Sequence, residues 1–249
     1  MQHKVVSREE WTKARKALLA KEKALTRQRD ALNRERLELP WVKVDKDYVF
    51  DSPTGKKTLA DLFDGRSQLI VKHFMLGPDW QEGCVGCSFG ADHLGGPLMH
   101  LSHHDITIVA VSRAPLEKIQ AYKKRMGWDF PWVSSANNTF NFDYHVSFTP
   151  EELANKAAYY NYQTIDPGVD ELPGFSVFYK DEQGEVFHTY STFARGSEAM
   201  SNSFAYMDIA PLGRNEPPGG NFSAWARRHD KYEDDGRQKP AKAKHGCCD

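Results

Sequence analysis

The sequence predicts an α/β fold in which helices flank a sheet. Two apolar runs, residues 69–76 and 106–111, have the composition of buried strands, and helical spacing follows each of them. The order strand, helix, strand, helix implies a parallel pair of strands joined by a right-handed crossover. Residues 175–180 and 185–191, separated by turn residues, predict an antiparallel hairpin.

Length and charge exclude several classes of protein. The 249 residues suffice for one sizeable domain with extensions, or for two small domains. A net charge of −1 gives no overall field that favours nucleic acid. The chain has no run of about 18 apolar residues, and its first residues lack the apolar segment of a signal peptide. We expect a cytoplasmic protein without membrane or nucleic-acid partners.

Residues 1–40 predict one long, charged helix. Ser7 and Glu10 fit a capping box, and Pro40 follows the expected end of the helix. A narrow apolar stripe recurs every seven residues at Trp11, Leu18, Leu25 and Leu32. Polar residues at half of the intervening core positions favour a solvated helix packed along the main domain. The alternatives are a dimerisation arm, which would make a homodimer through this helix, and a face for an anionic partner.

The remaining elements follow in chain order. Ahead of the first buried run, the pattern predicts a strand over 41–50, a turn over 51–55 and a short helical segment over 58–63. Before the hairpin it predicts a helix opened by Pro115, a short edge strand over 130–134, a helix capped by Thr149 and a loop over 161–172. A last helix is expected over 198–207. We expect three parts: a charged helix (1–40), a sheet domain (41–213) and a C-terminal extension with a disordered tail (214–249).

A Cys-x-x-Cys motif, Cys84 to Cys87, separates the first buried run from the helix that follows it. Unpaired N–H groups at a helix N-terminus favour negative charge, so a cysteine placed there ionises more easily. The thiolate is the nucleophile of disulfide exchange, and two intervening residues let the second thiol close a disulfide. The pattern predicts redox chemistry at Cys84 and Cys87.

Two other interpretations of the motif are a structural zinc half-site and a pair of buried thiols. Zinc needs four ligands, and the other two cysteines, Cys247 and Cys248, lie in the predicted tail. Those two are tail residues without a role, or a shuttle that relays electrons to the motif. We favour the first reading, because nothing in the sequence fixes the tail near the motif. We expect neither a metal nor an organic cofactor.

Several segments resemble one family across residues 6–232. They include HFMLGPDWQEGCVGCSF, ITIVAV with the helix after it, FPWVSS and SVFYKDEQGEVFHTYS. The order of elements resembles the thioredoxin fold, and the segments resemble the domain-of-unknown-function family eight-nine-nine, whose members are predicted dithiol–disulfide oxidoreductases. The resemblance implies a thioredoxin-like sheet and dithiol chemistry, but no substrate. ITIVAVS and FPWVSS also resemble peroxiredoxin-type relatives.

The resemblance implies further site residues. In thioredoxins a cis-proline before the hairpin faces the dithiol, which implies that role for Pro173 and a cis bond before it. Thioredoxins also carry a buried acid in the strand before the motif, where this chain has Lys72 and His73. These two residues and Trp80 are candidates for proton transfer or substrate contact.

The expected activity is thiol–disulfide exchange. Cys84 attacks a protein or small-molecule disulfide, Cys87 resolves the mixed disulfide, and an external thiol donor restores the pair. One alternative is a peroxiredoxin-like thiol peroxidase, in which Cys84 becomes a sulfenic acid before Cys87 condenses with it. Another is a non-catalytic binding module with the same fold.

Overall fold

The computed structural model describes residues 3–216 and 225–232. The chain divides into two compact units, Met1–Trp41 and Val42–Asp249. Among the described residues, no helix has both the length and the apolar character that a membrane crossing needs.

The first unit is built on one helix, α1 (Arg8–Leu37). The predicted capping box is formed: Glu10 N–H donates to the Ser7 hydroxyl, and the Glu10 carboxylate accepts from the Ser7 N–H. No residue of α1 is buried, and Leu25 in the apolar stripe is 67% exposed. A homodimer through this helix stays a prediction.

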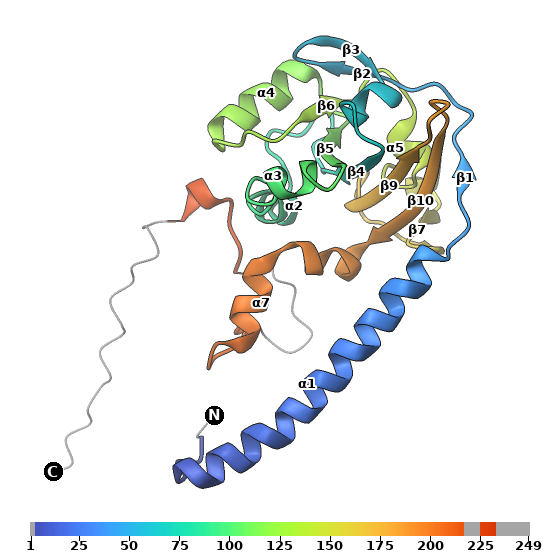
Figure 1. The fold of residues 1–249 in the computed structure, drawn as a ribbon. Coiled ribbons are helices and arrows are strands. Elements are labelled where there is room, and N and C mark those ends of the chain that lie inside the picture. The colour runs from blue at the N-terminus through green and yellow to red at the C-terminus, as the bar shows by residue number, and fades with distance from the viewer. Residues whose placement is uncertain (1–2, 217–224, 233–249) are drawn as a thin grey trace, which may run out of the picture. The chain divides into compact units, whose positions relative to one another are not determined.

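The second unit contains an eight-stranded sheet in the order β1-β10-β9-β4-β5-β6-β2-β3 (Figure 1). Its strands are β1 (Val42–Lys43), β2 (Val49–Ser52), β3 (Gly55–Thr58), β4 (Gln68–His73), β5 (Ile106–Ser112), β6 (Trp132–Ser134), β9 (Gly174–Lys180) and β10 (Val186–Phe193). β4, β5 and β6 are parallel, and β9 pairs antiparallel with both β4 and β10. The predicted α/β sheet, its parallel pair and its hairpin are confirmed.

Two strand predictions need correction. The single strand expected over 41–50 is two strands, because β1 pairs with β10 at one edge of the sheet and β2 pairs with β6 and β3 near the other edge. The segment expected at an edge, β6, lies inside the sheet, because β2 returns to pair with it on the side away from β5. β3 begins at Gly55, which was expected to end a turn, and ends at Thr58, which was expected to begin a helix.

Helices cover both faces of the sheet. One face is covered by α2 (Val85–Ala91), α3 (Leu98–Ser102) and α4 (Leu116–Arg125), and its core includes Cys87, Ile119 and Phe175. The other face is covered by the 3₁₀ helix η1 (Ala60–Phe63) and α5 (Phe140–Asp143), and its core includes Leu69 and Phe178. The separation into two apolar cores is the layered arrangement that the alternating pattern predicts.

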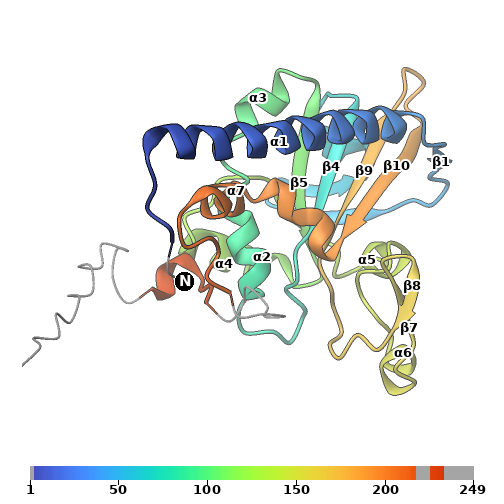
Figure 2. The same cartoon turned by 90° about the horizontal axis from the view of Figure 1, so that it is seen from below.

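The rest of the unit adds short elements. A second sheet of β7 (Ala158–Tyr160) and β8 (Gln163–Ile165) lies with α6 (Pro150–Ala154) at one end of the unit (Figure 2). β8 falls where a loop was expected. The chain continues through η2 (Ala194–Met200), α7 (Asn202–Ile209) and η4 (His229–Lys231). Residues 225–232 have defined contacts, so the prediction of a disordered tail is wrong for them.

A chain of buried hydrogen bonds crosses the sheet from β4 to β10. His73 Nε2 lies 2.9 Å from Ser176 Oγ, which lies 2.9 Å from Ser191 Oγ. Ser191 Oγ in turn lies 2.8 Å from His188 Nε2. Burial lowers the pKa of His73 to about 3 and also lowers the pKa of His188, so both rings are neutral near pH 7.

This chain of hydrogen bonds predicts that the folded protein becomes less stable in acid. In the folded protein His73 stays neutral, whereas in the unfolded chain it binds a proton below about pH 6.5. The contribution of His73 to the stability of the fold is therefore complete above about pH 6.5 and is lost as the pH falls toward 3. At about pH 5, His73 alone should lower the free energy of unfolding by about 2 kcal/mol. Urea denaturation at several pH values between about 5 and 7 measures the loss. His73→Gln should flatten this pH dependence, and replacing the exposed His103 by Gln should not; equal slopes in wild type and His73→Gln would contradict the assignment.

Candidate active site

The Cys-x-x-Cys motif lies at the turn between β4 and α2. The Cys84 N–H donates to the Met75 carbonyl at 3.0 Å, which ties the end of the turn back to the residues after β4. Cys84 is the N-cap of α2, and its carbonyl accepts from the Ser88 N–H at 2.9 Å and from the Ser88 hydroxyl at 2.8 Å. The predicted order of strand, turn and dithiol helix is therefore present.

The two thiols differ in exposure and in acidity. Both are free; Cys84 is half-buried and Cys87 is 2% exposed. A hydrogen bond from the Cys87 thiol, backbone N–H donors of Cys87 and Gly86, and the charge of Lys72 lower the pKa of Cys84 to about 6. The same hydrogen bond and complete burial raise the pKa of Cys87 well above its usual value. Cys84 is therefore the more accessible and the more acidic of the two thiols, and Cys87 is the more buried and the less acidic one.

Lys72 is the cation beside this dithiol. It lies in β4, is 5% exposed, and places Nζ 4.7 Å from the centre of the Phe175 ring. Burial lowers the pKa of Lys72, while the charges of both thiolates oppose that shift. A Cβ on Gly90 would lie 2.9 Å from Lys72 Nζ, so α2 approaches the amine closely because residue 90 has no side chain. Lys72 and the two thiols therefore influence one another electrostatically, and proton transfer by Lys72 stays a prediction.

The other basic candidate in β4 is not beside the dithiol. Successive side chains of a strand point to opposite faces, and the His73 ring lies 5.6 Å from Phe140 and 6.2 Å from Tyr144, in the core on the far side of the sheet. The proposal of His73 as a proton-transfer residue for the thiols is therefore wrong.

Trp80 is held by an ionic network. Its indole N–H donates to Asp170 at 3.2 Å, and Asp170 also accepts from Arg113 at 2.8 Å. Arg113 donates in addition to Glu171 at 2.7 Å, and burial raises the pKa of Glu171 to about 7. Trp80 packs against the same core as Cys84, so a substrate contact stays a prediction for it. The network was not predictable from the sequence, because its acids fall in the segment 161–172, which was expected to be a loop.

The prediction of a cis peptide bond before Pro173 is wrong. No described peptide bond is cis, and Gly174, directly after the proline, pairs with His73 at the start of β9. A trans X–Pro bond is the intrinsically favoured isomer, and it leads the chain into this strand pairing. The Pro173 carbonyl accepts a hydrogen bond from Tyr160 at 2.7 Å.

Two contributors to the site escaped the sequence analysis. Tyr122 in α4 has its hydroxyl 2.9 Å from that of Ser88, which bonds the Cys84 carbonyl. Arg228 donates to the carbonyl of Gly83, the residue before Cys84. Neither residue lies in a motif, and Arg228 falls in a stretch whose composition predicts disorder. Cys247 and Cys248 lie outside the described residues.

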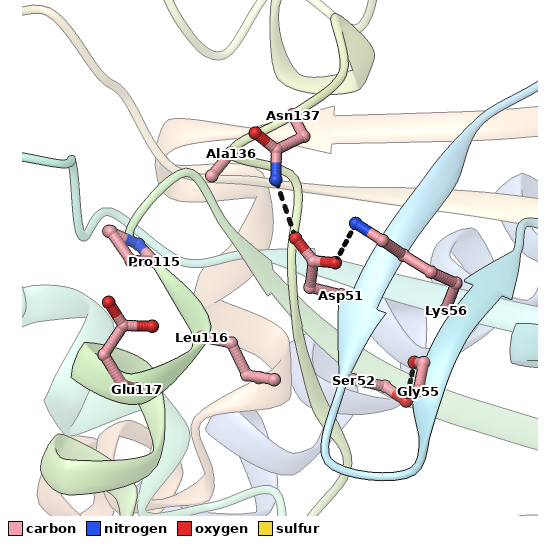
Figure 3. A pocket seen from close by; sticks show the side chains of 9 residues that line it. All are labelled: Asp51, Ser52, Gly55, Lys56, Pro115, Leu116, Glu117, Ala136 and Asn137. Atoms are coloured by element: carbon pink, nitrogen blue, oxygen red, sulfur yellow. Dashed lines mark hydrogen bonds and ion pairs between the residues drawn. The ribbon is translucent and has the colours of Figure 1, made fainter.

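A separate pocket of about 380 Å³ lies between the β2–β3 hairpin and the start of α4 (Figure 3). The Asp51 carboxylate pairs there with Lys56 and accepts from the Asn137 amide at 2.8 Å. Its lining residues are Asp51, Ser52, Gly55, Lys56, Pro115, Leu116, Glu117, Ala136 and Asn137. They include no cysteine, so the pocket is not the dithiol site.

The sheet order and the turn between β4 and α2 define a thioredoxin-like protein with a Cys-x-x-Cys pair at the start of the helix after its central strand. The chain belongs to the DUF899 family of bacterial proteins of unknown function, whose sequence profile matches residues 1–232. The family resemblance seen in the sequence is thus confirmed.

No curated protein sequence matches the chain. Similar solved structures include the peroxidoxin BcpB of Mycobacterium tuberculosis, with 13% identity and a TM-score of 0.42 over 68% of this chain and 96% of that chain. A peroxiredoxin Q mutant of Xylella fastidiosa has 15% identity and a TM-score of 0.40, covering 64% and 88% of the two chains. A candidate DsbE thiol:disulfide interchange protein of Chlorobium tepidum has 14% identity and a TM-score of 0.39, covering 68% and 97%.

The hydrogen bond between the thiols predicts a measurable pH profile. In the reduced protein, alkylation of Cys84 by iodoacetamide should rise with a midpoint near pH 6, because its thiolate is the reactive form. Cys87→Ala removes the thiol donor and should move the midpoint upward. Cys87→Ser keeps a hydroxyl donor and should move it less. A wild-type midpoint at the value of a free cysteine, or equal midpoints in all three proteins, would contradict the assignment.

Proposed function

We propose that this protein is a thiol–disulfide oxidoreductase in which Cys84 is the nucleophile and Cys87 the resolving thiol. The observation that carries the proposal is the asymmetry of the pair. An accessible thiol of low pKa lies directly in front of a buried thiol of high pKa, and a buried lysine lies beside both. Neither step below requires a metal or an organic cofactor.

The first step is attack on a substrate disulfide. The Cys84 thiolate forms a bond to one substrate sulfur, the substrate S–S bond breaks, and the other sulfur leaves as a thiolate that takes a proton. The Cys87 thiol and the backbone N–H groups of Cys87 and Gly86 lower the pKa of Cys84 to about 6, which favours the thiolate at neutral pH. The product is a mixed disulfide between Cys84 and the substrate.

The second step releases the substrate. Cys87 loses its proton and attacks the sulfur of Cys84, forming the Cys84–Cys87 disulfide and expelling the second substrate thiolate. Lys72 in its neutral form is the proton acceptor, since burial lowers its pKa and no thiolate remains on Cys84 at this stage. The substrate disulfide gains two electrons and two protons, and an external dithiol donor returns them to the Cys84–Cys87 pair.

Peroxide reduction is the second candidate. A thiolate that is populated at neutral pH also attacks a hydroperoxide, and the segments that form β5 and β6 resemble peroxiredoxin-type sequences. Cys84 would take one peroxide oxygen to become a sulfenic acid while an alcohol or water leaves. Cys87 would then condense with the sulfenic acid, forming the same internal disulfide and releasing water.

Trapping of a mixed disulfide, together with turnover of two substrates, distinguishes the oxidoreductase from the peroxidase and from a binding module. Cys87→Ser should accumulate a mixed disulfide through Cys84 with a disulfide substrate such as insulin, and the wild type should turn that substrate over with a dithiol donor. Trapping through Cys87 in Cys84→Ser would reverse the two roles. Turnover of hydrogen peroxide but not of insulin would favour the peroxidase. Reversible oxidation with turnover of neither would favour a non-catalytic binding module.

Substitution of Lys72 should slow the reaction without destabilising the fold. Lys72→Met replaces a buried amine by an apolar side chain of similar length, so the melting temperature should stay level or rise. Resolution of the mixed disulfide should nevertheless slow by about a hundredfold or more, the lower end of typical general-base contributions. Rapid-quench measurement of substrate release from the mixed disulfide gives this rate. An unchanged rate in Lys72→Met would remove Lys72 from the mechanism.

A further inference from the structure

We propose that Arg228 is a positioning residue for Cys84, holding the peptide group that precedes the nucleophile from a segment 145 positions beyond Gly83 in the chain. The inference rests on the proposed thiol chemistry and adds to it a residue of the C-terminal segment. Residues 225–232, here called the strap, form that segment, and the family match at residues 1–232 includes them.

The Gly83 carbonyl is the point of contact. Arg228 donates to this oxygen from Nε at 3.0 Å and from Nη2 at 2.6 Å. Because Cys84 is the N-cap, the first hydrogen bond inside α2 is accepted by the Cys84 carbonyl, and the Gly83 oxygen lies outside that series. Gly83 is buried, and a buried carbonyl without a partner is unfavourable. The guanidinium supplies two donors in a planar fork that a lysine cannot reproduce.

The same peptide group is held from its other end. The Cys84 N–H donates to the Met75 carbonyl at 3.0 Å. A Cβ placed on Gly83 would lie 2.6 Å from Phe74 Cε1 and 2.8 Å from Tyr122 Cε1, so the backbone of the turn lies directly on two aromatic rings. With both its oxygen and its N–H bonded, the peptide group fixes the direction in which the Cys84 side chain leaves the backbone.

The strap is anchored by packing. Ala226 is fully buried in a small apolar cluster with Phe89 of α2 and Phe204 of α7, and Trp225 packs against that cluster. His229 Nδ1 lies 2.7 Å from an Asp92 carboxylate oxygen, just after α2. The strap therefore contacts the helix that carries the dithiol on both sides of Arg228 in the sequence.

Charge fixes the Arg228 side chain within the strap. Its guanidinium is mostly buried, with 19% of the side chain exposed, and Nη1 lies 3.0 Å from Glu82. Glu82 also pairs with Arg125 at 2.5 Å, and Arg125 pairs with Asp230 of the strap at 2.7 Å. Glu82 is thus the ion-pair partner of Arg228, and Arg125 links Glu82 to Asp230.

The consequence for the chemistry is geometric. The backbone N–H groups of Gly86 and Cys87 lower the pKa of Cys84, and their effect on the sulfur depends on the direction in which its side chain leaves the backbone. Loss of the Arg228 contact frees the Gly83–Cys84 peptide group to rotate, and this effect weakens on average. The thiolate then loses stabilisation although no group that touches the sulfur has been removed.

The test uses the reduced, full-length protein and the pH profile of Cys84 alkylation, which does not depend on turnover. In Arg228→Ala the midpoint should rise by about one pH unit, which corresponds to about tenfold less thiolate at a pH below the midpoint. Arg228→Lys keeps the charge but not the fork, so it should recover only part of the shift. Arg125→Ala is the matched control, because it breaks pairs with the same Glu82 and Asp230 while leaving Arg228 in place.

Three outcomes decide the proposal. A shift in Arg228→Ala, with partial recovery in Arg228→Lys and none in Arg125→Ala, supports it. Full recovery in Arg228→Lys would assign the effect to charge alone and overturn the positioning role. Equal profiles in wild type and Arg228→Ala would also overturn it. Mixed-disulfide trapping with Cys87→Ser is scored separately, so the oxidoreductase assignment can stand if the role of Arg228 falls.

Discussion

The register of β4 is the constraint on which the candidate site depends. β4 is hydrogen-bonded on both sides, to β5 and to β9, so its side chains cannot change faces without breaking both ladders. This register directs Lys72 toward the dithiol and His73 into the opposite core. The register also fixes where β4 ends. The Met75 carbonyl, which accepts the hydrogen bond from the Cys84 N–H, lies just beyond that end. A slip by one residue would exchange the amine for an imidazole beside the thiols.

Burial of the Lys72 amine is unfavourable for folding, but the charge of this amine lowers the pKa of Cys84. A buried amine is unfavourable for folding, and the thiolates of Cys84 and Cys87 are the groups that oppose the lowering of the Lys72 pKa. Conversely, the amine favours the thiolate of Cys84 in surroundings where burial alone would favour the thiol. In the proposed cycle a proton moves between Lys72 and the sulfur atoms as the charge on them changes. Thioredoxins place a buried acid in this strand. A carboxylate that accepts a proton becomes neutral, whereas the neutral amine of Lys72 becomes a cation when it accepts one.

Much of the fold was predictable, because it rests on local patterns. The buried runs of β4 and β5, the hairpin β9–β10 and the caps of α1 and α6 all have short-range signals in the sequence. The errors arose where distant segments decide the outcome. β6 became an interior strand because β2 returns to it, and the segment expected as one strand divides because β1 pairs with β10 and β2 with β6 and β3. The dithiol was found from its spacing, and Lys72 from its place before the motif. The role of the strap was not predictable, because Arg228 reaches Gly83 only in three dimensions.

The central claim is that Cys84 and Cys87 exchange two electrons as a pair, and a redox titration tests it most directly. The protein is equilibrated in buffers of graded oxidised and reduced dithiothreitol, quenched with acid, alkylated and mapped by mass spectrometry. The account predicts one two-electron transition in which Cys84 and Cys87 become joined to each other and lose two hydrogens. The same transition should persist when Cys247 and Cys248 are both replaced by Ser. If Cys84 and Cys87 stay alkylatable at every potential, or join only to other cysteines, the account is contradicted.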